Sequence, residues 1–450
     1  MIIRFRKPCS NLSVWKCHLL SPRPTRFSGT DGVSLEATKW VETLEKLGHD
    51  CFFFAGESDW PAERSYVVPE AHLTHPDIQA LSTELFERRQ RSRSTSVTVT
   101  RLTQHLKKHL GRFIKKHKPH VLIVENALSL PMNIPLGLAI TELTAEVCIP
   151  VIAHHHDFTW ERDRYAVDAA TDYLRAAFPP TLEQVHHVVI NSYAKQQLAL
   201  HAGVSSTVIP NVMDFDRDPP EPDEYGSRFR EDLGIRPDQY ILLQPTRIIP
   251  RKRIEKAIEL ARRIELDCVL VVTHGSGDEG HDYKNYLQDY ASLLGVDLRL
   301  AAARCAQTRR HTPEGEQIYS LFDVYQQADL VTYPSQLEGF GNALLEAVYY
   351  RKPILTSTYR ILKTDIQPKG FRFIEFDDYF RPEFIDRVRE VLLNPCKVEG
   401  MVQHNFETGR HYYSFSVLQE QLANLLSTVS KEAGCAVTAN GHREGMEYSC

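Results

Sequence analysis

The stretch EGFGNALLE, residues 338–346, decides the fold, because a glycine-rich turn there joins a buried strand to a helix. The run before it, ADLVTYP (328–334), is short and apolar, and the run after it, ALLEAVYY (343–350), has helical periodicity. At a strand-to-helix junction, free backbone N–H groups and the positive end of the helix dipole favour an anionic ligand, typically a phosphate. The motif therefore predicts an α/β domain with an anion site at this junction.

Two carboxylates flank the turn. Glu338 reaches a ligand from the loop, while Glu346, about one helical turn beyond Asn342, points back toward it. Gly339 and Gly341 let the backbone approach closely. Because carboxylates accept hydrogen bonds from vicinal hydroxyls, two of them beside a phosphate site suggest a nucleotide sugar. For these residues taken alone, an ordinary helix start with two solvated glutamates is the alternative.

A basic turn lies upstream of this motif. The run YILLQ (240–244) is typical of a buried strand, PTRIIPRKR (245–253) follows it, and a helix is expected from about Ile254. Arg247 offers a planar fork for two phosphate oxygens and Lys252 a compact charge, so the pair can hold a diphosphate and stabilise it as it departs. For the neighbouring arginines of this turn, 251 and 253, solvation is a plausible alternative.

These segments resemble the retaining glycosyltransferases of the GT-B fold, specifically the family 4 type, also called glycosyl transferases group 1. VIPNVMDF (208–215) and LVVTHGSGDE (270–279) match as well, and the resemblance covers most of residues 15–430. It implies two Rossmann-like parallel-sheet α/β domains facing each other across a cleft. It also implies a nucleoside-diphosphate sugar as donor, with no metal and no other cofactor.

The resemblance assigns roles to individual residues. Arg247 and Lys252 would grip the diphosphate, Glu338 would touch the hydroxyls of the donor sugar, and Glu346 would bind the ribose. The catalytic residues it implies are Arg247, Lys252, Glu338 and His156. The donor-binding residues it implies in the second half are Gly339, Phe340, Gly341, Asn342, Ala343, Leu344, Glu346 and, in the base pocket, Arg304. The chain departs from the family pattern at Arg253 and at Asn211-Val212, where glycine is common after the lysine and after the asparagine, but neither change removes a charged group.

Length and composition bound the function. With 450 residues, of which 42% are hydrophobic, the chain is long enough for about two to three domains. A net charge of −5 argues against a nucleic-acid-binding protein. The nine cysteines form no C-x-x-C pair, which indicates reduced thiols and a cytoplasmic location. No apolar run approaches the roughly 18 residues of a membrane span, so no stable membrane insertion is expected.

Alternating strand-like and helix-like segments predict the domain organisation. In the first half, strands are expected at 14–20, 51–55, 120–124, 149–154 and 187–190. The acidic, proline-rich run DFDRDPPEPDEYG (214–226) is typical of a linker. We therefore expect a first domain over 1–213, a linker over 214–226, a nucleotide-sugar domain over 227–403, a helix over 404–430 that crosses back to the first domain, and a disordered tail over 431–450.

A second glycine-containing turn, FSGTDGVS (27–34), follows the first expected strand and opens a helix that Gly48 ends. Gly29 and Gly32 would let a donor phosphate or an acceptor lie against backbone amides, and Asp31 is an acceptor-binding candidate. The spacing is not that of a dinucleotide fingerprint, which argues against a redox enzyme. A tight strand-helix turn without a ligand is the alternative.

The segment AHHHDFTWERDRY (153–165) ends a predicted strand, where α/β sheets bind ligands. The resemblance places His156 beside the donor sugar. Consecutive residues of a strand point to opposite faces, so the three histidines cannot all converge on one ion, and no metal site is predicted. Arg162 and Arg164, with aromatic neighbours, could bind an acceptor carboxylate or phosphate. The alternative is an exposed helix start in which both arginines pair with residues 161 and 163.

Two further segments have open interpretations. Asn126, in the loop after the strand at 120–124, is an acceptor-site candidate. The basic segment 88–118 carries an apolar stripe that could rest on an anionic membrane or pack on the sheet, and packing is favoured.

The sequence thus predicts an enzyme that moves glucose or mannose, with retention, from a GDP-, UDP- or ADP-hexose to a small acceptor. The arginine pair favours an anionic acceptor such as a hydroxy acid or its glycoside. The alternatives are a peripheral-membrane lipid glycosyltransferase and a non-catalytic nucleotide-sugar-binding protein. The pattern does not predict the oligomeric state.

Overall fold

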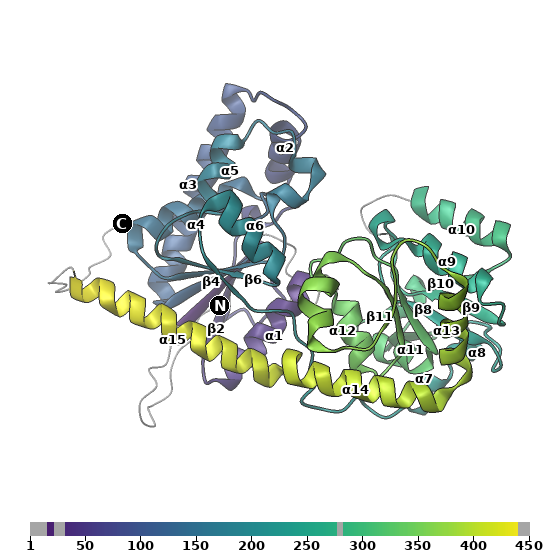
Figure 1. Ribbon diagram of the computed structural model, residues 1–450. Helices are drawn as coiled ribbons and strands as arrows, with labels where there is room; N and C mark the ends of the chain where they lie inside the picture. The colour runs from purple at the N-terminus through teal and green to yellow at the C-terminus, as the bar shows by residue number, and fades with distance from the viewer. Residues whose placement is uncertain (1–15, 22–31, 277–281, 440–450) are drawn as a thin grey trace. The chain divides into compact units, whose positions relative to one another are not determined.

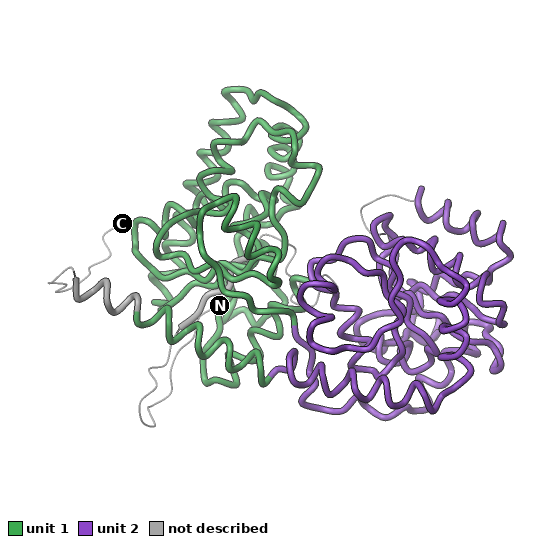
Figure 2. Tube along the Cα trace, viewed as in Figure 1, with its two compact units in different colours: residues 1–211, 416–450 green, residues 212–415 purple. Residues whose placement is uncertain are grey.

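The structure is a computed structural model that describes residues 16–21, 32–276 and 282–439. The chain forms two compact units, one comprising residues 1–211 and 416–450 and the other residues 212–415 (Figure 2). Each unit contains a parallel β-sheet with helices around it (Figure 1). The C-terminal segment from Ser416 groups with the first unit although it follows the second in the sequence.

The first unit is built on a seven-stranded sheet with the order β3-β2-β1-β4-β5-β6-β7, in which every neighbouring pair is parallel. Its central strands are continuous apolar runs such as VLIV, as expected of strands covered on both faces. The strands are β1 (Lys16–Ser21), β2 (Asp50–Ala55), β3 (Ser65–Val67), β4 (Val121–Glu125), β5 (Val151–His155), β6 (Val185–Val189) and β7 (Ser206–Val208).

Helices cover this sheet. They are α1 (Gly32–Lys46), α2 (Pro76–Leu85), α3 (Arg93–His117), α4 (Ile134–Val147), α5 (Thr171–Ala177), α6 (Ser192–Ala202) and α15 (Phe415–Ala439). The basic helix α3 buries its apolar stripe in the core, where Leu106, Leu110 and Phe113 cluster with Leu122 and Val124 of β4. Burying side chains of this size contributes roughly 1.5–3 kcal/mol each. The stripe is thus used for packing, as favoured from the sequence.

The second unit is built on a six-stranded parallel sheet with the order β10-β9-β8-β14-β15-β16. Its strands are β8 (Tyr240–Gln244), β9 (Cys268–Val272), β10 (Asp297–Leu300), β14 (Leu330–Tyr333), β15 (Ile354–Ser357) and β16 (Ile374–Phe376). A small side sheet contains β11 (Cys305–Ala306), β12 (Arg310–His311) and β13 (Gln317–Ser320). The helices are α7 (Glu224–Ser227), α8 (Phe229–Asp232), α9 (Ile254–Arg263), α10 (Asp282–Leu294), α11 (Leu321–Gln327), α12 (Asn342–Tyr349), α13 (Pro382–Leu393) and α14 (Pro395–Tyr413).

The C-terminal region differs from the single helix expected over 404–430. Helix α14 ends at Tyr413, Ser414 has an extended backbone with φ −80° and ψ 165°, and α15 begins at the next residue. The Tyr413 carbonyl accepts a hydrogen bond from the Met213 amide, with an N–O distance of 2.9 Å, which ties the end of α14 to the start of the second unit. Helix α15 continues to Ala439, past the expected end at residue 430.

The run predicted as a linker, residues 214–226, belongs to the second unit. Its last residues begin helix α7, because the Asp223 carboxylate accepts a hydrogen bond from the Gly226 amide at 3.0 Å and caps that helix. None of the helices that the structure describes combines the length and the apolar character needed to cross a membrane.

Candidate active site

In the second unit, the predicted phosphate and sugar residues follow two strands that are neighbours in the sheet. Strand β8 leads to Arg247 and to a short 3-10 turn ending at Lys252, and strand β14 leads to Glu338. Both strands run in parallel, so the loops after them emerge at the same edge of the sheet. The topology therefore places the two predicted motifs side by side.

Lys252 and Glu338 form a buried ion pair. The Lys252 ammonium donates to Oε1 of Glu338, and the two side chains are 10% and 8% exposed. Arg251 adds a second cation, with its Nη1 3.6 Å from Oε2 of Glu338 and 3.0 Å from the Leu337 carbonyl oxygen. Solvation was a plausible alternative for Arg251, and its side chain stays 30% exposed while its guanidinium joins the two loops. Arg253 pairs with Asp378 at 3.1 Å.

The charges of Lys252 and Glu338 each affect the pKa of the other. Burial works against ionisation of Glu338, but the Lys252 ammonium and the Arg251 guanidinium outweigh it, so the pKa of this carboxyl lies below its usual value. Burial lowers the pKa of Lys252, and the Arg251 and Arg247 guanidiniums act in the same direction against the pull of Glu338. Two cations thus contact one carboxylate, and Arg247 adds a third positive charge that acts on Lys252, so the site has a surplus of positive charge for an anionic ligand.

The glycine-rich turn is closely packed where α12 begins. Gly341 has φ +115° and precedes the helix as its N-cap. A Cβ atom on Gly341 would lie 3.0 Å from the Tyr359 hydroxyl and 3.2 Å from the Tyr333 hydroxyl, so only glycine fits without displacement. The Tyr359 hydroxyl donates to the Phe340 carbonyl at 3.1 Å and holds the turn in place. The turn is therefore rigidly positioned before any ligand binds.

Within α12, the backbone amide of Leu344 donates to the Gly341 carbonyl at 3.0 Å, so this N–H group is used inside the helix. The ligand contacts expected of Asn342 and Ala343, at the first two positions of the helix, stay predictions. Glu346 is half-buried, and its Oε2 accepts a hydrogen bond from the Tyr325 hydroxyl at 3.1 Å. That contact fixes the orientation of its carboxylate, whose expected role at the ribose stays a prediction.

His274 is a site residue that the sequence reasoning missed. It follows β9, the strand next to β8, and its Nδ1 is 2.8 Å from the Thr273 hydroxyl. Burial lowers the pKa of His274 to about 4, and the charges of Lys252 and Arg247 act in the same direction. A neutral imidazole therefore lies close to the predicted diphosphate grip. The signal available from the sequence was its place directly after an apolar strand.

Arg304, expected in the base pocket, is engaged by protein groups. Its guanidinium contacts Asp232 at 2.7 Å, Glu316 at 3.2 Å and the Gln317 carbonyl at 3.0 Å. These bonds join the turn before β11 to α8 and to the small side sheet. Contact of Arg304 with a base stays a prediction, and the visible role of its side chain is to fix this part of the unit.

The first unit contains a second group of polar residues, at the ends of the adjacent strands β4 and β5. Glu125 is completely buried, and its carboxylate contacts both Nδ1 of His154, at 3.0 Å, and Nε2 of His156, at 3.1 Å. The Oδ1 of Asn126 accepts the backbone N–H of His156 at 3.0 Å, and the expected contact of Asn126 with the acceptor stays a prediction. Asn126 has φ +56°, a conformation that asparagine tolerates. Glu125 was missed because charged residues at strand ends are common.

The three consecutive histidines do not share one direction, as predicted, but two of them converge. His155 contacts His187, with Nε2 of the first 2.9 Å from Nδ1 of the second, whereas His154 and His156 both contact Glu125. Two imidazoles and a carboxylate within 4.8 Å of one another are a set that a divalent transition metal accepts. The argument from alternation therefore excluded only a three-histidine site. The atoms that would bind such an ion are the ones that form the hydrogen bonds between Glu125 and the two histidines.

The loop after β5 does not form the expected helix start. It contains two 3-10 turns, η2 (Thr159–Glu161) and η3 (Asp163–Tyr165). Arg162 pairs with Asp157 at 2.8 Å, and Arg164 contacts the Tyr165 hydroxyl. The alternative in which both arginines pair with residues 161 and 163 is wrong, because Arg162 pairs with Asp157 and the Glu161 carboxylate accepts the Phe158 amide at 2.8 Å. Burial raises the pKa of Glu161 to about 7.

Two predicted contacts lie beyond what the structure describes. Gly29 and Asp31 are outside the described residues. Gly32 is exposed and is the first residue of α1, consistent with a turn that opens this helix.

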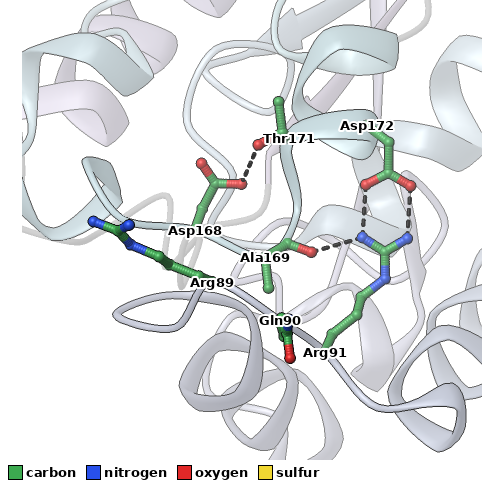
Figure 3. Close-up of a pocket in the computed structure, with 7 residues that line it drawn as sticks. All are labelled: Arg89, Gln90, Arg91, Asp168, Ala169, Thr171 and Asp172. Carbon is green, nitrogen blue, oxygen red and sulfur yellow. Dashed lines mark hydrogen bonds and ion pairs between the residues drawn. The ribbon is translucent and has the colours of Figure 1, made fainter.

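A surface hollow of about 470 Å³ lies elsewhere on the first unit (Figure 3). The Arg91 guanidinium donates hydrogen bonds to both carboxylate oxygens of Asp172, at 2.6 Å each, and to the Ala169 carbonyl. The Arg89 side chain points away from this cluster (Figure 3). The hollow contains none of the predicted site residues. Its lining residues are Arg89, Gln90, Arg91, Asp168, Ala169, Thr171 and Asp172.

Comparisons with known proteins agree with this geometry. The profile of the family described as glycosyl transferases group 1 matches residues 315–405, which include β14, the glycine-rich turn and α12. The mannosylglucosylglycerate synthase of Petrotoga mobilis is 34% identical over 381 residues, covering 78% of this chain and 84% of that protein. The enzyme of the same name from Thermotoga maritima is 31% identical over 426 residues, covering 87% and 96%.

The fold has solved counterparts. The crystal structure of sucrose-phosphate synthase from Thermosynechococcus elongatus superposes with a TM-score of 0.65 at 14% identity, over 92% of this chain and 99% of that chain. This likeness concerns the fold alone and confirms the GT-B class predicted from the sequence. Taken together with the relatives, it shows that the chain belongs to the glycosyl transferases group 1 family and is a glycosyltransferase of the GT-B fold.

Proposed function

We propose that the protein transfers a hexose from a nucleoside-diphosphate sugar to a glycoside of a small hydroxy acid, with retention of the anomeric configuration. The observation that carries this proposal is the pairing of Lys252 and Arg251 with Glu338, with the charge of Arg247 acting on Lys252, beside the tightly packed glycine turn. A surplus of cationic charge next to a carboxylate suits a ligand that is anionic at one end and rich in hydroxyls at the other.

On the donor side, the diphosphate would take Lys252 as a partner, and Arg247, exposed at the same edge, would bind the second phosphate. Glu338 keeps Arg251 at 3.6 Å when Lys252 turns to the phosphates, so its charge stays compensated while it accepts a hydrogen bond from the sugar. As the bond from the sugar to the diphosphate breaks, these cations stabilise the leaving group, which is where the rate is gained.

The proposed acceptor is inferred from the names of two related enzymes. Both are named mannosylglucosylglycerate synthases, and the matched regions span 84% and 96% of their lengths. We infer that the acceptor is glucosylglycerate or a close analogue and that mannose is the sugar transferred. Arg162 is a candidate for the carboxylate of the acceptor, because its side chain is 35% exposed and its partner Asp157 can share it. His156 would contact the donor sugar and orient it.

The test is a transfer assay with the purified full-length chain. GDP-, UDP- and ADP-activated mannose and glucose are each combined with glucosylglycerate and with glycerate, and products are identified by mass and by the one-bond C1–H1 coupling in NMR. We expect a mannosylated product with the anomeric configuration of the donor. Inverted configuration, or no product on either acceptor, contradicts the proposal.

Two other outcomes identify the alternatives. Donor binding by calorimetry without any transfer product would indicate a nucleotide-sugar-binding protein. Transfer onto a glycolipid in vesicles, with none onto glucosylglycerate, would indicate a lipid glycosyltransferase.

A further inference from the structure

The carboxylate of Glu125 has an unusual environment for an acidic side chain. It is fully buried at the end of β4, and its hydrogen-bond partners among the described residues are two imidazoles, those of His154 and His156. The two rings lie against each other with their centroids 4.3 Å apart, and the indole of Trp40 stacks on His154 at 4.2 Å. Within residues 16–21, 32–276 and 282–439, no lysine or arginine pairs with Glu125, and the contacts that its carboxylate makes there are with these rings.

The bond pattern determines which nitrogen of each ring carries hydrogen. Burial disfavours the charged carboxylate, but the contacts with His154 and His156 outweigh burial, and the pKa of Glu125 lies below its usual value. An ionised carboxylate only accepts hydrogen bonds. Nδ1 of His154 and Nε2 of His156 must therefore both be N–H donors. In its neutral form, His156 is then the Nε2–H tautomer, and its Nδ1 carries a lone pair.

The backbone of His156 is fixed by the residue next to Glu125. Asn126 accepts the His156 amide at 3.0 Å and the Asp157 amide at 3.3 Å, and its Oδ1 also accepts the Ser129 hydroxyl at 2.8 Å. Two consecutive residues thus hold His156 in place. Asn126 binds the main-chain N–H of His156, and Glu125 binds its imidazole ring. Nδ1 of His156 has no hydrogen-bond partner in the part of the chain that the structure describes, so it is the ring nitrogen that a ligand can take.

We propose that Glu125 is a positioning residue for transfer, which orients the ring of His156 and fixes its tautomer so that Nδ1 accepts a hydrogen bond from a hydroxyl of the bound sugar. This inference rests on the proposed function for the contact between His156 and the sugar. The tautomer itself is a property of the protein without substrate. A failure of the proposed function and a failure of this assignment can therefore be told apart.

The first test needs no carboxylate variant. The full-length protein is labelled with ¹⁵N in its histidine rings, and the His156 signals are assigned by their loss in His156→Ala. We expect the Nε2–H tautomer, with an unprotonated Nδ1. The opposite tautomer would overturn the assignment of Glu125 whether or not the chain transfers mannose.

The second test is Glu125→Gln, which keeps the size of the side chain. Glutamine offers one acceptor oxygen and one donor group, so it cannot accept from both rings, and one imidazole must change its tautomer or lose its bond. We expect kcat/KM to fall by about tenfold or more, as when a wrong tautomer is imposed on a catalytic histidine, with the dissociation constant of the nucleoside diphosphate unchanged. The ¹⁵N spectrum of His156 should change as well.

A double-mutant cycle asks whether Glu125 acts through His156. In the His156→Ala background, Glu125→Gln should cause no further loss, whereas independent roles would give multiplicative losses and overturn the proposal. Glu161→Gln is the matched control, because Glu161 is a half-buried carboxylate of the neighbouring loop that accepts one backbone amide at 2.8 Å, a bond that glutamine can keep. It should retain activity and the His156 signals.

A metal requirement would also overturn the assignment. If the purified enzyme contains a stoichiometric divalent ion, loses activity to a chelator, and no longer retains the ion after Glu125→Gln, then Glu125 is a metal ligand and not a positioning residue. We expect activity to be insensitive to the chelator.

Discussion

Lys252 and Glu338 hold opposite charges in contact where a diphosphate is proposed to bind. A buried pair of this kind adds little net stability, because the desolvation of both ions offsets their attraction. Its value lies in keeping both side chains ionised and in place. The function of the pair therefore appears in the rate of transfer more than in the free energy of unfolding.

Lys252→Ala tests this assignment. The variant leaves Glu338 with Arg251 at 3.6 Å, so we expect a stability loss of only about 1–3 kcal/mol by urea unfolding. Because the departing diphosphate loses a cation, kcat/KM should fall by about 100-fold or more.

The matched control for this variant is Lys256→Ala, which removes a lysine from the next turn of the chain. Lys256 is half-buried in α9, where it pairs with Glu259 at 2.9 Å and its ammonium lies 5.7 Å from the centroid of the Phe380 ring. Its loss should leave kcat/KM unchanged and cost about 1–2 kcal/mol. A Lys252→Ala enzyme with nearly unchanged kcat/KM would remove this lysine from the mechanism.

Single residues differ in how well the sequence reveals them. Lys252, Glu338 and the glycines belong to compact motifs with a recognisable chemistry. Arg251, His274 and Glu125 could not be assigned in the same way, because their roles depend on partners distant in the sequence or on alternative pairings. His156 was found through the resemblance, but its contact with Glu125 required the register of β4 and β5.

Among the elements, the start of α12 is under the tightest steric constraint. Gly341→Ala would place a methyl group in the left-handed region and against the hydroxyls of Tyr359 and Tyr333. We expect a stability loss of about 1–3 kcal/mol. Because the turn must shift to make room, kcat/KM should fall too, as measured in the transfer assay.

Gly370→Ala separates the effect of backbone strain from the effect of steric crowding. Gly370 has φ +92°, also in the left-handed region, but a Cβ there meets no atom within 4 Å. It should cost about 1 kcal/mol from backbone strain alone and leave transfer unchanged. Equal losses of activity in the two alanine variants would show that crowding at Gly341 is unimportant.

The sequence predicts the core elements well because their patterns are local. The runs at 240–244 and 328–334 contain β8 and β14, and the helix expected from residue 254 begins there as α9. The break at Ser414 was not predicted, because helical periodicity continues across it and no proline or glycine marks the interruption. The turns η2 and η3 were also missed, since Glu161 caps the first of them through a contact that competes with surface pairing.

For the whole molecule, buried neutral histidines predict an acid-sensitive fold. Burial lowers the pKa of His49, His187 and His274 to about 4 each. Between pH 6.5 and 4 the unfolded chain binds protons at these positions and the native chain does not, so stability falls as the pH falls. We expect urea-unfolding free energies measured across this range to decline by up to about 3 kcal/mol for the buried His187, and by less for His49 and His274, which are half-buried.

His187→Asn tests whether these histidines cause the dependence of the unfolding free energy on pH. An asparagine side chain can replace Nδ1 of His187 in its contact with His155, at 2.9 Å in the native protein, but does not titrate. The variant should bind about one proton fewer on acid unfolding. An unchanged pH slope would assign the acid sensitivity to other groups.

At the same scale, length and strand-helix alternation predicted about two to three α/β domains, because a parallel sheet requires strand-helix repetition whatever the detailed contacts are. The GT-B class was implied by the resemblance to the group 1 glycosyltransferases. The assignment of residues 212–226 to the second unit could not be predicted from the composition of that run. It depends on contacts such as the one between Asp223 and Arg309, whose guanidinium also contacts Asp323.

The indole of Trp40 gives the protein an optical reporter. Of the four tryptophans in the sequence, Trp40 stacks on His154, whereas Trp60 stacks on Phe53 and Trp160 on Phe158. A change of charge in the imidazole alters its interaction with the indole face and hence the fluorescence emission. With Trp15, Trp60 and Trp160 replaced by phenylalanine, emission from Trp40 would follow events at the Glu125 carboxylate in real time, without a label and without a coupled assay.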